Sequence, residues 1–277
     1  MEVAARRVKV RASSWAGLFD CPSRWEGVHL LGMKSVSGLR ATLGTAVHAS
    51  TAVFDQGRMN GDGITATEAA AAFIDRLHHP EGEVDYRGED LTIQQAERIG
   101  LTLHSKYCND ISPSYDFVAV EMATEPLVID CGDGLEIEVT GTMDRARVVR
   151  GEYGVGIGDI KTGKMAVTKD DKGRPVAQTA GHAAQIGTYE LLYENTTGES
   201  ITAPAEIIAL STGARQEVAV GQIENARDVL LGTEETPGLI QYAAQMFKSG
   251  LFHPNNKSQL CSAKYCPRHS RCAFRDK

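Results

Sequence analysis

Two aspartates and a lysine occur in two segments with the alternation of neighbouring β-strands. Asp144 falls in the segment 135–149, and Asp159 and Lys161 fall in the segment 155–161 that follows a turn. Side chains two residues apart point to the same face of a strand, so Asp159 and Lys161 should lie together. Such carboxylates can hold Mg²⁺ or Mn²⁺ for phosphodiester hydrolysis, while the lysine offsets phosphate charge. A surface aspartate beside an Asp-x-Lys pair is also common, so these three residues alone leave both interpretations open.

The strings around these residues are more specific. The first is Gly141-Thr142-Met143-Asp144-Arg145, and the second is Gly158-Asp159-Ile160-Lys161-Thr162-Gly163. They closely resemble the central motifs of the RecB-like branch of the PD-(D/E)XK nucleases. The resemblance implies an α/β fold with a restriction-endonuclease-like core, in which helices flank a mixed sheet. It also implies that Asp144 and Asp159 bind metal and that Lys161 assists the attacking water.

Further positions fit the same branch. Gly44-Thr45-Ala46-Val47-His48 matches its histidine on an early helix, and small residues leave room beside the imidazole. Gln185 and Tyr189 match its Gln-x-x-x-Tyr motif and share one helix face. The resemblance implies that His48 is a metal ligand and that Gln185 and Tyr189 support catalysis, while Glu121 resembles a recurrent acidic position. Without the other motifs, a lone core histidine and an amphipathic packing helix would explain these residues.

Four of the six cysteines could form one metal site. Cys261, Cys266 and Cys272 cluster near the C-terminus, and Cys21 lies some 240 residues earlier. Spacing alone favours Zn²⁺, which also takes four thiolates. The pattern resembles AddB-type subunits and CRISPR-associated exonucleases, which implies a [4Fe–4S] cluster. The family usually separates its first clustered pair by two residues rather than four, which makes Cys261 the least secure ligand.

The charge distribution favours a polyanionic partner. The chain carries a net charge of −7, but residues 1–40 carry +4 and residues 248–277 carry +6, which leaves −17 on the rest. Two basic ends on an acidic body suit binding of DNA at one place. The expected DNA contacts are Arg145, Thr162, Lys264, Arg268 and Arg271.

The periodicity predicts one α/β domain over residues 1–277. We expect a helix at 42–56 and two strands at 117–129 and 135–149. Helices are expected at 65–79, 91–109, 177–195, 222–231 and 238–249, and strands at 155–161, 205–210 and 217–220. The three strands between 117 and 161 should form an antiparallel core, residues 57–114 a helical insertion, and residues 10–25 with 250–277 an iron–sulfur lobe.

These expectations add up to a Mg²⁺- or Mn²⁺-dependent DNA exonuclease that acts on duplex ends or single strands. The sequence has no signal peptide and no run long enough to span a membrane, which favours a cytoplasmic protein of a bacterium, an archaeon or a phage. It also lacks a P-loop, so any helicase would be a separate partner, as would a recombinase or a CRISPR integration protein. The alternatives are a CRISPR spacer-processing nuclease and a catalytically silent DNA-end-binding protein. The oligomeric state is not predicted.

Overall fold

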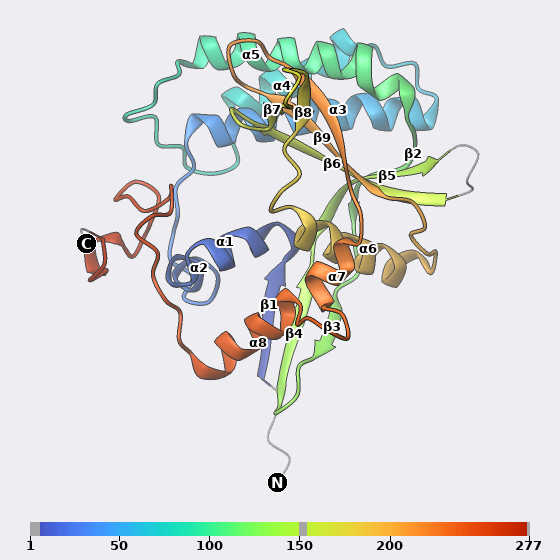
Figure 1. Cartoon of the computed structure of the whole chain (residues 1–277). Coiled ribbons are helices and arrows are strands. Elements are labelled where there is room, and N and C mark those ends of the chain that lie inside the picture. Colours follow the sequence, from blue (N-terminus) through green and yellow to red (C-terminus); the bar gives the residue numbers. More distant parts are fainter. Residues whose placement is uncertain (1–5, 150–153, 276–277) are drawn as a thin grey trace.

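A five-stranded mixed sheet forms the centre of the protein in a computed structural model that describes residues 6–149 and 154–275 (Figure 1). Its strand order is β10-β9-β6-β5-β2, with β6 and β9 parallel and the other neighbours antiparallel. The strands are β2 (Asp116–Ala123), β5 (Thr142–Val149), β6 (Gly154–Gly163), β9 (Ala205–Ser211) and β10 (Val218–Ile223). The expected α/β fold with a mixed sheet is therefore confirmed.

A second, three-stranded sheet has the order β1-β4-β3. Its strands are β1 (Arg6–Arg11), β3 (Leu127–Asp130) and β4 (Leu135–Thr140). β1 was not expected from the sequence, yet it pairs in parallel with β4 and buries Val8 and Val10 beneath exposed arginines. This strand brings the N-terminal end of the described chain into the core.

The segments 117–129 and 135–149, each expected as one strand, are instead each divided between the two sheets. The second breaks at Gly141, where a Cβ atom would lie 2.8 Å from Cε1 of Tyr189. A glycine is needed there because the chain passes so close to the ring. The first segment breaks beside it, where the backbone N–H and the hydroxyl of Thr124 both donate to the Gly141 carbonyl oxygen. The expected antiparallel three-strand core is thus one side of a larger sheet, with β2 at its edge.

Helices cover both faces of the five-stranded sheet (Figure 1). They are α3 (Leu39–Asn60), α4 (Ala66–His78) and α5 (Ile93–Lys106) on one face and α6 (Ala183–Thr197) on the other. Strand β9 contributes Ile208 and Leu210 to the apolar cluster with α3, and Ile207 and Ala209 to the cluster with α6. Burial on both faces explains why β9 is a continuous apolar run rather than an alternating one.

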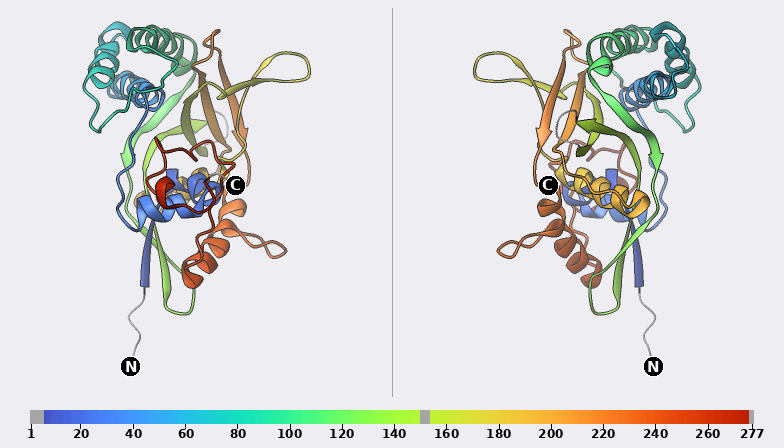
Figure 2. Two further views of the ribbon diagram at one scale, coloured as in Figure 1. Left: turned by 90° about the vertical axis from the view of Figure 1, so that its left-hand side faces the viewer. Right: turned by 90° about the vertical axis from the view of Figure 1, so that its right-hand side faces the viewer.

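The remaining elements surround this centre. They are α1 (Trp15–Asp20), α2 (Pro22–His29), α7 (Ala226–Leu231), α8 (Leu239–Ser249) and the hairpin of β7 (Val167–Lys169) and β8 (Pro175–Ala177). The tail after α8 lies beside α1 and α2 in both views of Figure 2. Hydrogen bonds join it there, from Ser23 N to the His253 carbonyl oxygen and from Asn255 Nδ2 to the Asp20 carbonyl oxygen. The segment that links α1 and α2 therefore meets the C-terminal tail.

The helix predictions agree closely with the structure. The helices expected at 42–56, 65–79 and 91–109 are confirmed as α3, α4 and α5, and capping boxes begin α4 and α5. The helix expected at 177–195 begins later, at Ala183, because residues Pro175–Ala177 form β8. Among the described residues, none of the helices has the length and apolar character that a bilayer crossing requires.

Candidate active site and cysteine pocket

Asp144 and Asp159 face each other across the antiparallel pair β5 and β6. Arg145 of β5 pairs with Gly158 of β6, and Asp144 and Asp159 are the next residues along the two strands. The backbone N–H of Ile160 donates to Asp144 Oδ2 over 2.9 Å. Asp144 is not a surface aspartate, because residues 143–147 of β5 are all buried. Its carboxylate instead points into a site enclosed by the sheet and α3.

Four of the predicted catalytic residues form one hydrogen-bonded group. Lys161 Nζ lies 2.6 Å from Asp159 Oδ2 and donates to Gln185 Oε1 over 3.0 Å. Gln185 Nε2 donates to Asp159 Oδ1 over 3.2 Å and to the Tyr189 hydroxyl over 3.1 Å. The four-residue spacing on α6 therefore directs Gln185 and Tyr189 toward the strand that carries Asp159 and Lys161.

A second group brings together a histidine and two carboxylates. One ligand atom each from His48, Glu121 and Asp144 lies within 4.8 Å of the other two. His48, on α3, places Nδ1 3.4 Å from Asp144 Oδ2. The sequence-based metal set was His48, Asp144 and Asp159. In the structure Glu121 occupies the third position of this group, while Asp159 is bound by Lys161 and Gln185.

Glu121 reaches this position through an unusual backbone conformation. Its φ angle is +46°, although it lies within β2 between Val120 and Met122, which both pair with β5. Non-glycine residues rarely adopt this left-handed region, and such strain is concentrated at functional sites. No sequence pattern predicted this conformation. The available signal was a glutamate opposite the Asp144 strand, which the family resemblance had already indicated.

The electrostatics of the site favour a cation. Burial, with a further contribution from Asp144, raises the pKa of Asp159 despite the neighbouring Lys161. Burial and then Asp144 likewise raise the pKa of Glu121 to about 7, although solvent screens this side chain because 42% of it is exposed. Burial lowers the pKa of His48, which favours the neutral imidazole that metal binding requires.

The donor set of His48, Glu121 and Asp144 fits a divalent metal ion. One imidazole nitrogen and two carboxylate oxygens are common ligands of Mn²⁺, and the carboxylates also suit Mg²⁺. The crowded carboxylates with raised pKa values are a second sign, because a bound cation would relieve their mutual repulsion. The residues present are therefore chemically suited to the metal that the sequence predicted.

The expected DNA contacts have different surroundings. Arg145 is fully buried and pairs with Asp55, and Thr162 lies under α3, where a Cβ on Gly44 would be 3.7 Å away. Lys264 and Arg268 are ion-paired with glutamates of the protein, whereas Arg271 is exposed. Of the five, Arg271 is thus the side chain that the fold leaves most available to a ligand.

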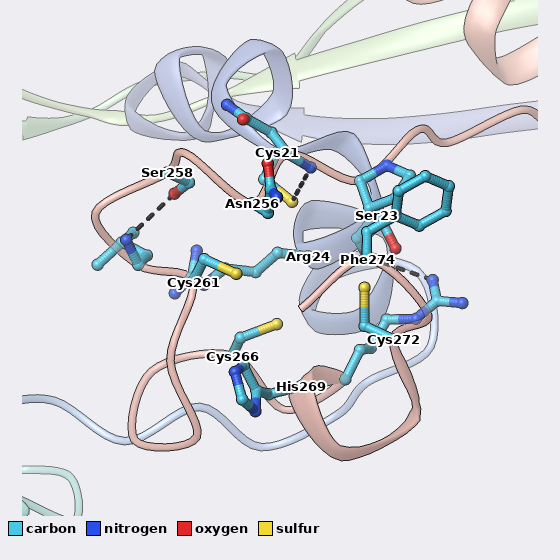
Figure 3. Close-up of a pocket in the computed structure, with 14 residues that line it drawn as sticks. Cys21, Ser23, Arg24, Asn256, Ser258, Cys261, Cys266, His269, Cys272 and Phe274 are labelled. Atoms are coloured by element: carbon cyan, nitrogen blue, oxygen red, sulfur yellow. Dashed lines mark hydrogen bonds between the residues drawn. The ribbon is translucent and has the colours of Figure 1, made fainter. Parts of the chain in front are cut away.

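The four clustered cysteines line one pocket between α2 and the C-terminal tail. Figure 3 shows Cys21, Cys261, Cys266 and Cys272 around a common space, with residues of both chain ends between them. The backbone N–H of Asn255 donates to Cys21 Sγ over 3.4 Å. Cys108 lies elsewhere, in the core beneath α3. The fold therefore brings residue 21 to the tail, as a site shared by both ends requires.

Similarity to known proteins is found at the level of the family. The family model of the PD-(D/E)XK nuclease superfamily matches residues 12–273. A crystal structure from Eubacterium rectale, described as a "Putative exonuclease", is 13% identical with a TM-score of 0.44. That match covers 86% of this chain and 77% of the other. No curated protein matches the sequence. With almost its whole length matched and an acidic site beside Lys161, the chain belongs to the PD-(D/E)XK nuclease superfamily.

Proposed function

We propose that the protein is a deoxyribonuclease that depends on Mg²⁺ or Mn²⁺ and hydrolyses phosphodiester bonds as an exonuclease. The observation that carries this proposal is the His48, Glu121 and Asp144 group beside the ion pair of Asp159 and Lys161. A bound metal would supply Lewis-acid chemistry and lower the pKa of an attacking water. A binding protein without catalysis would have no need for clustered carboxylates at a phosphate.

Each side chain has a distinct role in this proposal. His48, Glu121, Asp144 and Asp159 would hold the metal. Lys161 would orient the water or offset negative charge on the phosphate in the transition state. Gln185 holds both Asp159 and Lys161, and Tyr189 supports Gln185 from one turn further along α6. The helix α6 therefore fixes the geometry of the lysine strand.

DNA ends or single strands are the proposed substrate. The support is the RecB-like form of the motifs, together with exposed cations such as Lys257 and Arg271 in the tail. The test is cleavage of labelled single-stranded DNA, linear duplex and closed circular duplex, each with and without Mg²⁺ or Mn²⁺. Metal-dependent loss of the linear substrates alone is the expected result. Binding without cleavage under every metal condition would instead favour a silent DNA-end-binding protein.

We further propose that Cys21, Cys261, Cys266 and Cys272 hold a [4Fe–4S] cluster with a structural role. Their position around one pocket supports a shared metal centre. The tail that carries three of them is polar and mostly partly exposed, so it buries little apolar surface by itself. Four thiolate bonds from residue 21 to residue 272 would fasten both chain ends.

Metal analysis distinguishes this cluster from a structural Zn²⁺ ion. Protein purified without oxygen should be brown and contain about four iron atoms per chain, as the cluster formula requires. About one zinc and no iron per chain would replace the cluster by a zinc site, which four thiolates hold equally well. Hydrolysis needs no electron transfer, so the nuclease proposal does not depend on this outcome.

A further inference from the structure

Asp55 is a buried carboxylate that lies outside the group of candidate metal ligands. Its side chain is on α3, two turns after His48, and is 0% exposed. It accepts hydrogen bonds from Arg145 Nε over 2.7 Å, from the Tyr107 hydroxyl over 2.6 Å and from Ser112 Oγ over 2.5 Å. A buried carboxylate with three donors is held in a single orientation.

Arg145 connects this carboxylate to the candidate metal site. Its guanidinium is also 0% exposed, and it follows Asp144 in β5. Nη1 donates to the backbone oxygen of Asp144 over 2.7 Å and to Glu121 Oε1 over 3.3 Å. Nη2 donates to Thr51 Oγ1 over 3.3 Å. One rigid, planar cation therefore touches both Asp55 and a carboxylate of the metal group.

The charge of Arg145 has to be balanced by another carboxylate if Glu121 is to bind a metal ion. A buried guanidinium requires a carboxylate partner, and Asp55 supplies one at the shorter distance. If Asp55 were neutral, Arg145 would turn its charge toward Glu121 and compete with a metal cation for the same oxygen. The left-handed backbone conformation of Glu121 must also be stabilised by surrounding contacts, because without them the residue would adopt an ordinary strand conformation.

We infer that Asp55 is a positioning residue for the metal site, which acts through Arg145 to keep Glu121 beside His48 and Asp144. This inference rests on the proposed metal-dependent function and adds a residue to it. Asp55 also joins the site to the helical region before β2, because Tyr107 begins a π-helical turn after α5 and Ser112 follows that turn. The helical region before β2 is thereby connected to the metal ligands through Asp55 and Arg145.

The test measures the affinity of the whole chain for Mn²⁺ in the absence of DNA. Electron paramagnetic resonance gives the concentration of the free ion. Asp55→Asn keeps the size of the side chain and removes its charge. Affinity should fall about ten-fold or more, as is typical when a partner of a metal ligand is changed. Tyr107→Phe should cause a smaller loss. The control is Asp75→Asn on α4, where the carboxylate is 78% exposed and pairs with His79, and this variant should bind Mn²⁺ as the wild type does.

A double-mutant cycle separates positioning from general loosening of the fold. If Asp55 acts through Glu121, Asp55→Asn should have little further effect in a Glu121→Gln background. Equal losses in both backgrounds would overturn the inference, as would a folded Asp55→Asn protein with wild-type affinity. If Asp55→Asn does not fold, unchanged affinity of Tyr107→Phe overturns it. A wild-type protein that binds no Mn²⁺ would instead refute the proposed function itself.

Discussion

Lys264 in the cysteine-rich tail and Glu89 in the loop before α5 form an ion pair of 2.8 Å, with both side chains largely buried. Glu89 also accepts a hydrogen bond from the backbone N–H of Leu39, the first residue of α3, over 3.2 Å. Gly38 leaves room for this carboxylate, since a Cβ there would come into close contact with Glu89 Oε1. One carboxylate thus fastens the tail to the beginning of the helix that carries His48.

The first prediction concerns this connection. Glu89→Gln should lower the free energy of unfolding, because it leaves Lys264 without its charged partner and weakens the acceptor of the Leu39 N–H. Urea unfolding measures the change. Asp90→Asn is the matched control, since its pair with Arg40 is more exposed and should contribute less to stability. Equal effects of the two substitutions would show that Glu89 has no special fastening role.

The second prediction concerns catalysis. Asp159→Ala and Lys161→Ala should each raise the activation free energy of cleavage by on the order of 4 kcal/mol, which lowers the rate about a thousand-fold, while the fold is retained. The measurement is single-turnover cleavage of labelled linear DNA, with circular dichroism as the folding check. Lys169→Ala in the β7–β8 hairpin, where the lysine pairs with Glu217, should leave the rate unchanged. A near-normal rate for Asp159→Ala would refute the assignment.

The third prediction is a pH dependence of metal binding. Because the pKa values of Glu121 and Asp159 are raised, with that of Glu121 near 7, protons compete with the metal. Calorimetric Mn²⁺ affinity should therefore fall as the pH is lowered through about 7, and Glu121→Gln should flatten the profile.

The same raised pKa values affect the stability of the metal-free protein, because the folded protein retains protons on these carboxylates that the unfolded chain has released. Its stability should therefore decrease as the pH rises from the ordinary carboxyl range toward 7, and added Mn²⁺ should offset this loss.

The fourth prediction concerns the cysteine pocket. Cys21→Ala should lose the bound metal and lower the unfolding midpoint, because Cys21 is the one residue of the proposed cysteine site that precedes α2 while the other three lie in the tail. Cys131→Ala is the control, since Cys131 lies in the turn after β3. Metal content and thermal unfolding are measured on the same preparations. Retention of full metal content by Cys21→Ala would remove this residue from the site.

The fifth prediction concerns DNA affinity. Lys257 and Arg271 are exposed in the tail, whereas Lys264 and Arg268 are bound to glutamates of the protein. Neutralising Lys257 and Arg271 together should weaken binding at low salt and reduce the slope of log affinity against log salt by about 2, which is about 1 per phosphate contact. Fluorescence anisotropy at several salt concentrations measures the slope. An unchanged slope would place the DNA path away from the tail.

Local sequence determined much of this protein. The helices α3, α4 and α5 follow from apolar periodicity, and α4 and α5 also from capping boxes, which depend on neighbouring residues only. The adjacency of Asp159 and Lys161, and of Gln185 and Tyr189, follows from the repeats of a strand and a helix. These distances are set by backbone geometry over a few residues, so a linear pattern is sufficient to predict them.

Tertiary structure alone decided the rest. The division of two expected strands at Gly141 depends on the approach of Tyr189, a residue 48 positions later. The role of Glu121 depends on a left-handed backbone held by contacts across the sheet, and Arg145 is buried because Asp55 on α3 balances its charge. Which basic residues remain free for DNA likewise depends on acidic partners far away in the chain, such as Glu89 for Lys264. Burial and charge pairing between distant segments leave no local signal, because they arise only when the whole chain has packed.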